Sequence, residues 1–590
     1  MFHVKRLYAF LLKILFVFHR IFPVFPNRRA LERSAWRAII KYFSMLQLHP
    51  MSILSVLQSN IREKRWGQFA AMTGLAVWAV LLIGVFFSTQ PTSGLYIDNQ
   101  STYFIQGLRL SGKHPYLESD WFAQTKPLHI AFTYLIALLA RWEILPGAIA
   151  VMDMLFRLVF LASAGLLVNA LLDLIEPKMP GGPLRRAGLA LSVITFYVLS
   201  LWPVFQLSDF FERIGVSSLA LAIEKFGFYY SLGGFAAFRY YTEPASFSVL
   251  IFTALALMPY RRWRWSAALL GIAGLMHASY LIHSGALAGV MVLYLWVKGQ
   301  RDEAFRVTGI YAAFVLPLVV YIATQLTDSQ TAAANLILAL ERVPHHTQPT
   351  RWWEGTDTVH TAVIVASAAL LWWKDRGLTR WAILATTLYV GIGIGLVLWT
   401  ENPSLAILMP WRASGYLYAV SQLVMLTAGL VIIVKVLSRW PLFADSILLI
   451  LPVALLIWSA MENGVFSVLA EEYENTATQA AYPFMERIRQ ETPADAVLLI
   501  PLRDGDYRLG AQRPIFVDWK SHPYKGSEVL DWWRRVEFVR AFYNLPASER
   551  QQGCQTAEAD FYVLEEAQLG KTEQLVISWE NLILVRCPGP

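Results

Sequence analysis

Residues 68–87 read QFAAMTGLAVWAVLLIGVFF, an apolar run without a charged residue. An α-helix needs about twenty such residues to cross the hydrocarbon core of a bilayer, so this run predicts a membrane span. The segment before it, residues 1–67, is strongly basic and ends with Arg62, Lys64 and Arg65 close to the run. Because basic segments are retained in the cytoplasm, we expect the N-terminus to be cytoplasmic and the span to lead outward.

The composition of the whole chain is that of a polytopic membrane protein. Of 590 residues, 56% are hydrophobic and only 16% are charged, and the mean hydropathy is +0.44. Soluble chains carry about 25% charged residues, so soluble, collagen-like, disordered and disulfide-rich secreted classes are excluded. The net charge of +8 does not indicate nucleic-acid binding, because the basic residues stand in short clusters between apolar runs.

These alternating apolar runs and basic turns predict an all-α membrane domain over residues 68–461, with about eleven transmembrane helices. An odd number of spans puts the chain after residue 461 outside the cytoplasm. Residues 1–24 are basic and apolar at helical spacing; a surface-lying amphipathic helix, a further span and a cleaved signal peptide are the three interpretations. The expected spans are 68–88, 148–174, 187–206, 244–260, 266–282, 284–298, 307–325, 359–373, 380–399, 416–437 and 443–461.

Residues 462–590 have the composition of an ordinary water-soluble domain, and we expect an α/β domain outside the membrane. Its only cysteines, which are the only two of the chain, are Cys554 and Cys587. An oxidising compartment permits them to form a disulfide, and two buried free thiols are the alternative. The apolar patterns predict strands at 496–501, 514–519, 561–565 and 581–587 and a helix at 529–543.

The first outer loop, residues 89–147, is rich in polar groups, and its acidic residue, expected helices and basic segment follow one another in an organised arrangement. Asp98 follows the first span within a few residues, and a short helix is expected at 101–110. Lys126 and Pro127 then lead into the apolar piece 128–139. That piece is too short to span a bilayer, so we expect it to be an interfacial helix.

This arrangement resembles the GT-C superfamily of integral-membrane glycosyltransferases, which includes aminoarabinose transferases and protein O-mannosyltransferases. The resemblance lies in Asp98 after the first span, Tyr103 and Phe104 in a juxtamembrane helix, the segment Lys126-Pro127-Leu128, and Arg157 early in the next span. It implies transfer of a hexosyl or pentosyl group from a polyprenyl-phosphate carrier to a glycan, lipid or protein acceptor at the outer face. The family usually has two adjacent acids where this chain has Asp98-Asn99.

Such a transfer needs a carboxylate that takes the acceptor proton. Asp98 is the candidate base, and capping of the following helix is its alternative role. Glu243 and Asp209 are candidates for a second catalytic acid. Glu243 precedes Pro244 at a helix start, where it is equally suited to complement the helix dipole, and Asp209 fits a solvated surface as well.

Cations must stabilise the departing phosphate, and the outer loops provide them. The candidates for substrate binding are Lys126, Arg342, His345, His346, Arg351 and Arg412. Structural roles are open for each, and the adjacent histidines are a weak metal signal, so we expect no cofactor, although a divalent metal is possible. A further polar cluster occupies residues 502–508 and 517–523, which suits either closure over the active cavity or packing within the domain.

Two other functions remain open on the sequence. A non-catalytic scaffold of a polysaccharide assembly machine is favoured by the single acid at Asp98-Asn99, whereas a transporter or flippase predicts ionisable groups in mid-span and an inverted repeat. We expect a multi-pass protein of a bacterial inner membrane that acts in cell-envelope polysaccharide synthesis. Its partners would be membrane lipid, a lipid-linked sugar and an acceptor, and no nucleic acid.

Overall fold

The computed structural model describes much of a helix-rich region, called the membrane domain (residues 99–437), and a C-terminal region with a small sheet, called the C-terminal domain (residues 482–588). All described residues belong to one unit of the chain, Thr73–Pro590. The predicted first span, the last span apart from Leu448, the basic segment 1–67 and the candidates Asp98 and Asp209 lie outside the described residues. The described residues are Tyr96, 99–179, 182–201, 231–238, 241–375, 377–437, 448 and 482–588.

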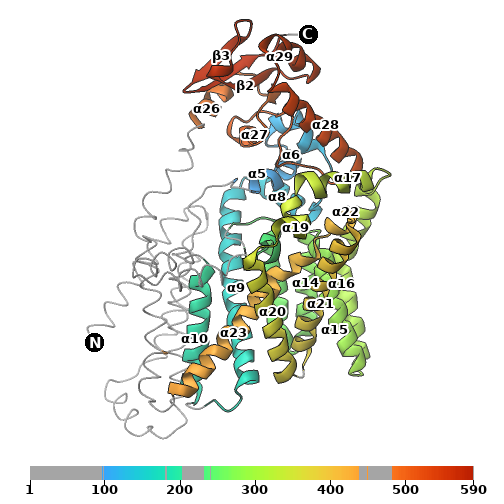
Figure 1. The fold of residues 1–590 in the computed structure, drawn as a ribbon, viewed down its shortest axis with the longest axis vertical. Helices are drawn as coiled ribbons and strands as arrows, with labels where there is room; N and C mark the ends of the chain where they lie inside the picture. The colour runs from blue at the N-terminus through green and yellow to red at the C-terminus, as the bar shows by residue number, and fades with distance from the viewer. Residues whose placement is uncertain are drawn as a thin grey trace, which may run out of the picture. The chain divides into compact units, whose positions relative to one another are not determined.

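Five helices among the described residues are long and apolar enough to cross a membrane. They fall on predicted spans and run side by side in Figure 1. The total of about eleven spans stays a prediction. The five are α9 (Leu145–Ile175), α15 (Tyr280–Val297), α16 (Arg301–Tyr321) with its continuation η5 (Ile322–Leu326), α21 (Leu378–Thr400), and α23 (Ser414–Leu437) with the short helices before it.

The predicted span at 244–260 is a single apolar helix that is shorter than these five. It consists of η3 (Pro244–Phe247), α13 (Ser248–Leu257) and η4 (Met258–Tyr260). Proline has no backbone N–H and favours the first turn of a helix, which accounts for the helix start at Pro244. The other helices of this region are α10 (Gly182–Leu201), η2 (Leu232–Gly234), α14 (Trp263–Met276), α17 (Thr331–Ile337), η6 (Leu338–Arg342), α18 (Pro344–Thr347), α19 (Pro349–Trp352), α20 (Gly355–Lys374), α22 (Pro403–Ala406) and η7 (Pro410–Ala413).

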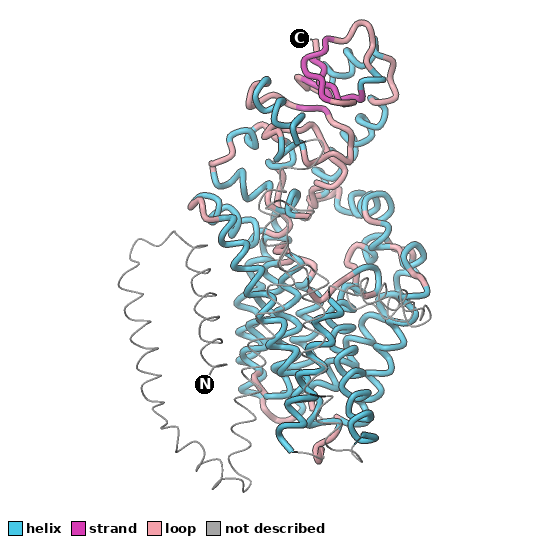
Figure 2. The backbone as a smooth tube through the Cα atoms, turned by 90° about the vertical axis from the view of Figure 1, so that its left-hand side faces the viewer, coloured by secondary structure: helices cyan, strands magenta, loops and turns pink. Residues whose placement is uncertain are grey.

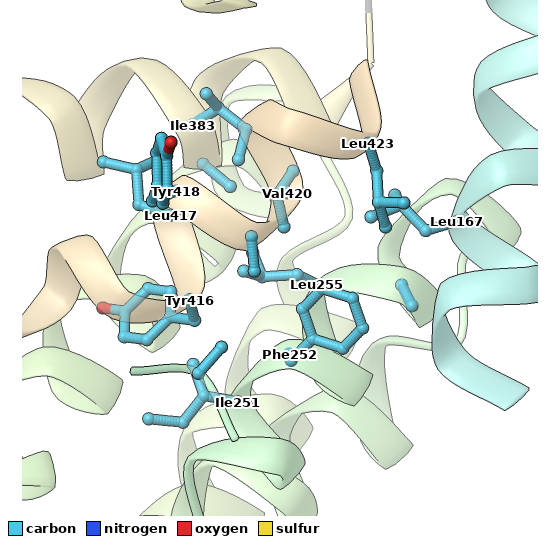
Figure 3. Packing of buried hydrophobic residues seen from close by; sticks show 14 of the residues in the cluster. Leu167, Ile251, Phe252, Leu255, Ile383, Tyr416, Leu417, Tyr418, Val420 and Leu423 are labelled. Atoms are coloured by element: carbon cyan, nitrogen blue, oxygen red, sulfur yellow. The ribbon is translucent and has the colours of Figure 1, made fainter. Parts of the chain in front are cut away.

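The core of the helical region is centred on α13 and α23. Helix α13 is apolar on all sides, and a helix of that kind is stable when other helices surround it. Figure 3 shows Phe252 and Leu255 of α13 packed with Leu423 of α23 and Leu167 of α9. This packing joins the beginning, middle and end of the described membrane region into one hydrophobic cluster.

The first outer loop folds into short helices: α5 (Gln100–Tyr103), α6 (Ile105–Ser111), η1 (Pro115–Glu118), α7 (Trp121–Gln124) and α8 (Ile130–Arg141). The helix predicted at 101–110 is divided at Phe104, and the predicted interfacial helix is α8, which has 12 residues. Helices α6 and α8 approach closely at Gly107, where a Cβ atom would lie 2.7 Å from the carbonyl oxygen of Thr133.

The C-terminal domain contains the predicted mixture of helices and strands. Its four-stranded sheet has the order β1-β2-β4-β3, with β1 parallel to β2 and the other pairs antiparallel. Figure 2 shows the strands only in the part of the described chain that carries the C-terminus. The elements are α26 (Tyr482–Glu491), β1 (Leu498–Leu499), α27 (Tyr507–Gly510), α28 (Gly526–Phe542), α29 (Ala547–Thr556), β2 (Phe561–Glu565), η9 (Glu566–Gln568), β3 (Gln574–Trp579) and β4 (Leu582–Arg586).

Two strand assignments from the sequence need correction. Residues 514–519 form a single bridge from Ile515 to Leu498 and then turn away, because the Asp518 carboxylate binds the backbone N–H groups of Lys520 and Ser521. Strand β3 was not predicted from the sequence. It is an edge strand whose burial does not alternate cleanly, and its Leu575 is 46% exposed.

The structure pairs Cys554 of α29 with Cys587 after β4, and their Cα atoms are 5.7 Å apart. We expect the native protein to incorporate no thiol-alkylating reagent after denaturation alone and two equivalents after reduction, as measured by mass spectrometry. Replacing both cysteines by serine should destabilise the C-terminal domain by about 2–4 kcal/mol, because without the cross-link the unfolded chain has a higher conformational entropy. Two alkylated cysteines without prior reduction would contradict the pairing.

Candidate functional site

A cavity of about 60 Å³ lies where the first outer loop meets the C-terminal domain. This is roughly the space of four or five ordered water molecules, which suits a phosphate group. The cavity is lined by Asn99, Thr102, Tyr103, Gln106, Phe122, Lys126, Leu128, His129, Thr133, Arg342, Lys520, His522, Pro523 and Tyr524.

Three of the lining residues are cationic and none of the described lining residues is acidic. The cations come from separate parts of the chain: Lys126 from the first loop, Arg342 from the end of η6, and Lys520 from the C-terminal domain. The Arg342 guanidinium donates to the Lys520 carbonyl oxygen at 3.2 Å, and its Nε atom is buried without a hydrogen-bond partner among the described residues. Positive charges gathered around one cavity favour an anionic ligand.

Two tyrosines and two histidines form the rest of the polar wall. The ring of Tyr103 meets that of His129 edge-on at 5.2 Å, and Tyr524 lies 5.0 Å from His522 and 6.5 Å from His129 between ring centres. Burial is the main cause that raises the pKa of both Tyr103 and Tyr524. Both phenols are therefore protonated near neutral pH, and each hydroxyl is able to donate a hydrogen bond.

A buried ionic network joins the first loop to the C-terminal domain. Arg508 of α27 donates to Asp120 and to Asp518, at 2.8 Å in each case. All three side chains are at most 1% exposed. Asp120 also caps α7 by accepting from the N–H of Ala123 and accepts from the N–H of Ile515. One carboxylate thus holds its own loop and the C-terminal domain together.

The same network shapes the segment 520–524, which lines the cavity. Asp518 accepts from the backbone N–H groups of Lys520 at 2.8 Å and Ser521 at 2.6 Å, while Arg508 donates to the Ser521 hydroxyl at 3.0 Å. The Arg508 charge helps to hold the pKa of Asp518 below its usual range, so the carboxylate stays ionised despite burial. The ion pair therefore fixes the turn that presents Lys520 and His522 to the cavity.

Further contacts attach the C-terminal domain on either side of the cavity. The backbone N–H of Lys126 donates to Glu528 at 3.0 Å, and Ser527 donates to Asp328 from its backbone and its hydroxyl. Burial raises the pKa of Glu528, which lies beside the cationic Lys126. Both contacts involve the first turn of α28, so the helix start is held from two directions.

The structure places the sequence-predicted substrate residues unequally. Lys126 and Arg342 line the cavity. His345 and Arg351 are exposed, and neither lines it. His346 bonds through Nδ1 to the Gly233 carbonyl oxygen at 2.9 Å. The short helices α18 and α19 turn the segment after Arg342 toward η2, so none of these three residues lines the cavity, and their role in substrate binding stays a prediction.

Arg412 lies behind the cavity wall. Its guanidinium donates to Nε2 of His277 at 3.2 Å, and the His277 ring lies 4.3 Å from that of His129 between centres. The guanidinium carbon of Arg412 lies over the Phe235 ring, 4.6 Å from the ring centre. Arg412 is thus one ring removed from the lining, and its charge acts on the cavity through His129.

Glu243 is also near the cavity without lining it. It is buried, it forms the N-cap of η3, and its N–H donates to the Ser246 hydroxyl at 3.1 Å. Its charge contributes to the raised pKa of Tyr103, which does line the cavity. Glu243 thus occupies the N-cap position of η3, next to the first outer loop, and its role in catalysis stays a prediction.

Two residues of the cavity lining, His129 and Tyr524, were not among the site residues predicted from the sequence. His129 follows directly on Lys126-Pro127-Leu128 and forms the N-cap of the interfacial helix α8, so its position was a usable signal. Tyr524 adjoins the polar segment 517–523, for which closure over a cavity was one of the expectations. No group of three or more potential metal ligands occurs within the residues that the structure describes.

Residues 479–539 match a protein-family model described as a domain of unknown function, DUF6798. This match includes Arg508, Asp518 and the segment 520–524. No curated protein matches the chain.

Similar solved structures come from membrane glycosyltransferases. An oligosaccharyltransferase from Archaeoglobus fulgidus aligns over 82% of this chain and 68% of its own, with 12% identity and a TM-score of 0.41. ArnT from Cupriavidus metallidurans aligns over 88% of this chain and 100% of its own, with 13% identity and a TM-score of 0.38. Both are of the GT-C kind that the sequence resembles.

The ionic network predicts a specific stability effect. Replacing Arg508 by Gln leaves two buried carboxylates without their cation and should cost about 3–5 kcal/mol. Arg534→Gln on α28 is the matched control, since its side chain is 77% exposed and its ion pair should contribute about 0–1 kcal/mol. Tryptophan fluorescence during thermal unfolding in detergent compares the two variants. Equal unfolding midpoints would contradict a central role for Arg508.

Proposed function

We propose that the protein is a membrane glycosyltransferase that moves a sugar from a polyprenyl-phosphate carrier to an acceptor at the outer face of the membrane. The observation that carries this proposal is the small cavity lined by Lys126, Arg342 and Lys520, without a described acidic lining residue. A phosphate group fits such a site in size and charge, and the arginine presents planar donors that suit phosphate oxygens.

The position of the cavity supports an outward-facing site. Tyr321, at the end of α16, donates to the Pro127 carbonyl oxygen in the first loop at 2.9 Å. The other end of α16 begins at Arg301, beside the basic turn that the positive-inside rule assigns to the cytoplasm. The cavity therefore belongs to the end of the helix opposite the cytoplasmic turn, in agreement with the expected bacterial inner-membrane topology.

The chemistry assigns roles to separate groups. Asp98 takes the proton of an acceptor hydroxyl while that oxygen bonds to the anomeric carbon from the face opposite the phosphate. The bond between that carbon and the phosphate oxygen breaks, and polyprenyl phosphate leaves with the electron pair. Lys126, Arg342 and Lys520 stabilise the charge that develops on the phosphate. The acceptor is a glycan, lipid or protein hydroxyl in a cell-envelope polymer, and the reaction needs no organic cofactor.

A non-catalytic scaffold is the second candidate function, because Asp98 is followed by Asn99 rather than by a second acid. A scaffold of this kind would hold a lipid-linked glycan in the cavity for another enzyme. Lipid binding is therefore common to the two functions, whereas dependence of sugar transfer on Asp98 belongs to the first alone.

Arg342→Gln should weaken the binding of decaprenyl phosphate about tenfold, because it removes a charged donor from the phosphate. Binding is measured by titration calorimetry with the purified protein in detergent. Arg534→Gln is the control, because it removes the same charge at an exposed position of α28. It should bind decaprenyl phosphate as the wild type does. Equal affinities of the wild type and Arg342→Gln would contradict the phosphate site.

Asp98→Asn should abolish transfer and leave decaprenyl-phosphate binding within about twofold, because the amide cannot accept the hydroxyl proton. The readout is release of decaprenyl phosphate from radiolabelled decaprenyl-phosphate sugars, with host membranes as the source of acceptor. Release by Asp98→Asn at the wild-type rate would remove Asp98 from catalysis and favour the scaffold.

A further inference from the structure

Two histidines line the cavity from separate parts of the chain. His129 stands at the start of α8 in the first loop, and His522 belongs to the segment that precedes α28. The ring of Tyr524 contacts both, at 6.5 Å and 5.0 Å between ring centres. The two imidazoles therefore share one small space, and their hydrogen-bonding capacities there differ.

The backbone fixes the tautomer of His129. Its Nδ1 atom lies 3.2 Å from the backbone nitrogen of Ala278, which donates its hydrogen. A backbone N–H group can only donate, so Nδ1 must offer a lone pair and the ring proton is on Nε2. Burial, and next the charge of Arg412, lower the pKa of His129 to about 3, which keeps the ring neutral. His129 thus presents an Nε2–H donor.

The opposite tautomer is fixed at His522. Its Nδ1 atom lies 3.1 Å from the Lys520 carbonyl oxygen, which can only accept. Nδ1 therefore carries the proton and Nε2 has the free lone pair. Burial, and next the charge of Arg342, lower the pKa of His522 to about 3. His522 thus presents an Nε2 acceptor in a wall that otherwise contains three cations.

Neither Nε2 atom has a hydrogen-bond partner among the residues that the structure describes. Both residues line the cavity, so a ligand or a water molecule there can supply the partner. A phosphate oxygen can accept from His129 but has no hydrogen for His522 unless it is protonated. A hydroxyl group donates and accepts at once, so hydroxyl groups are the ligand chemistry that suits both rings.

We propose that His129 and His522, one as a donor and the other as an acceptor, recognise hydroxyl groups of the sugar carried by the lipid phosphate. This assignment rests on the proposed function. The cations bind the phosphate, which donor and product share, while the histidine pair contacts only the sugar-bearing lipid. The pair therefore distinguishes the glycosylated donor from the bare polyprenyl phosphate that remains after transfer.

The variants His129→Asn and His522→Asn test this assignment. Asparagine places its amide near the position of Nδ1, so it keeps the bond to Ala278 or Lys520 and removes the Nε2 atom. Glutamine, whose longer side chain reaches the position of Nε2, is the rescue variant at each site. His114→Asn is the matched control, because His114 lies in the same loop and does not line the cavity.

The measurement compares the affinities for bare decaprenyl phosphate and for decaprenyl-phosphate mannose, glucose and arabinose in detergent. The wild type should prefer at least one glycosylated lipid. Each asparagine variant should bind the preferred glycosylated lipid about five- to tenfold more weakly. Its affinity for the bare lipid should stay within about twofold of the wild type. The glutamine variants should recover part of the lost affinity for the glycosylated lipid. Unchanged bare-lipid binding also shows that the variants are folded.

The results that overturn the two proposals are different. Wild-type protein that binds bare decaprenyl phosphate but prefers none of the glycosylated lipids would overturn the histidine assignment alone. The histidine assignment would also be overturned if the asparagine variants kept the wild-type preference, or if they lowered the affinities for both kinds of lipid equally. Wild-type protein that binds no decaprenyl lipid would overturn the proposed function itself.

Discussion

The buried bond between Arg508 and the carboxylates of Asp120 and Asp518 is the constraint on which the candidate site depends. Three charges removed from water are stable only when they satisfy one another, and the 2.8 Å contacts of Arg508 to both acids do so. Asp120 belongs to the first outer loop and Asp518 to the turn before the segment 520–524. The arginine therefore sets the position of the two walls of the cavity relative to each other.

The remaining architecture supports that junction from both sides. Helices α6 and α8 pack closely through Gly107 and hold the first loop above the membrane helices, and Tyr321 of α16 bonds to the loop at Pro127. On the other side the start of α28 is held by Asp328 and by the backbone of Lys126. Neither the membrane domain nor the C-terminal domain contains the complete cavity alone, so the fold makes the site dependent on their contact.

Much of the fold could be predicted from sequence because membrane spans depend on long-range averages of hydropathy. The long helices α9, α16, α21 and α23 fall where apolar runs and basic turns placed them. Local chemistry was less predictable. The strand expected at 514–519 gives way to a turn because Asp518 binds two backbone N–H groups, a preference that a β-branched apolar pattern does not reveal. Strand β3 has a weak pattern because it lies at the sheet edge.

The candidate site also contains some residues that the sequence predicts and others that it does not. Lys126 and Arg342 were predicted because cations beside a membrane are conspicuous, and both line the cavity. His345 and Arg351 had equal standing in the sequence, yet the backbone of α18 and α19 carries them elsewhere. His129 and Tyr524 are 395 positions apart along the chain, and only tertiary contact reveals that their rings adjoin. Asp98 and Asp209 lie outside the described residues and stay predictions.

The most direct test of the account is an experimental structure of the protein with decaprenyl phosphate bound. The account predicts that the phosphate lies in the cavity between Lys126, Arg342 and Lys520, with Arg508 still joined to Asp120 and Asp518. A phosphate bound at another place, with these three cations paired to acidic groups instead, would contradict it.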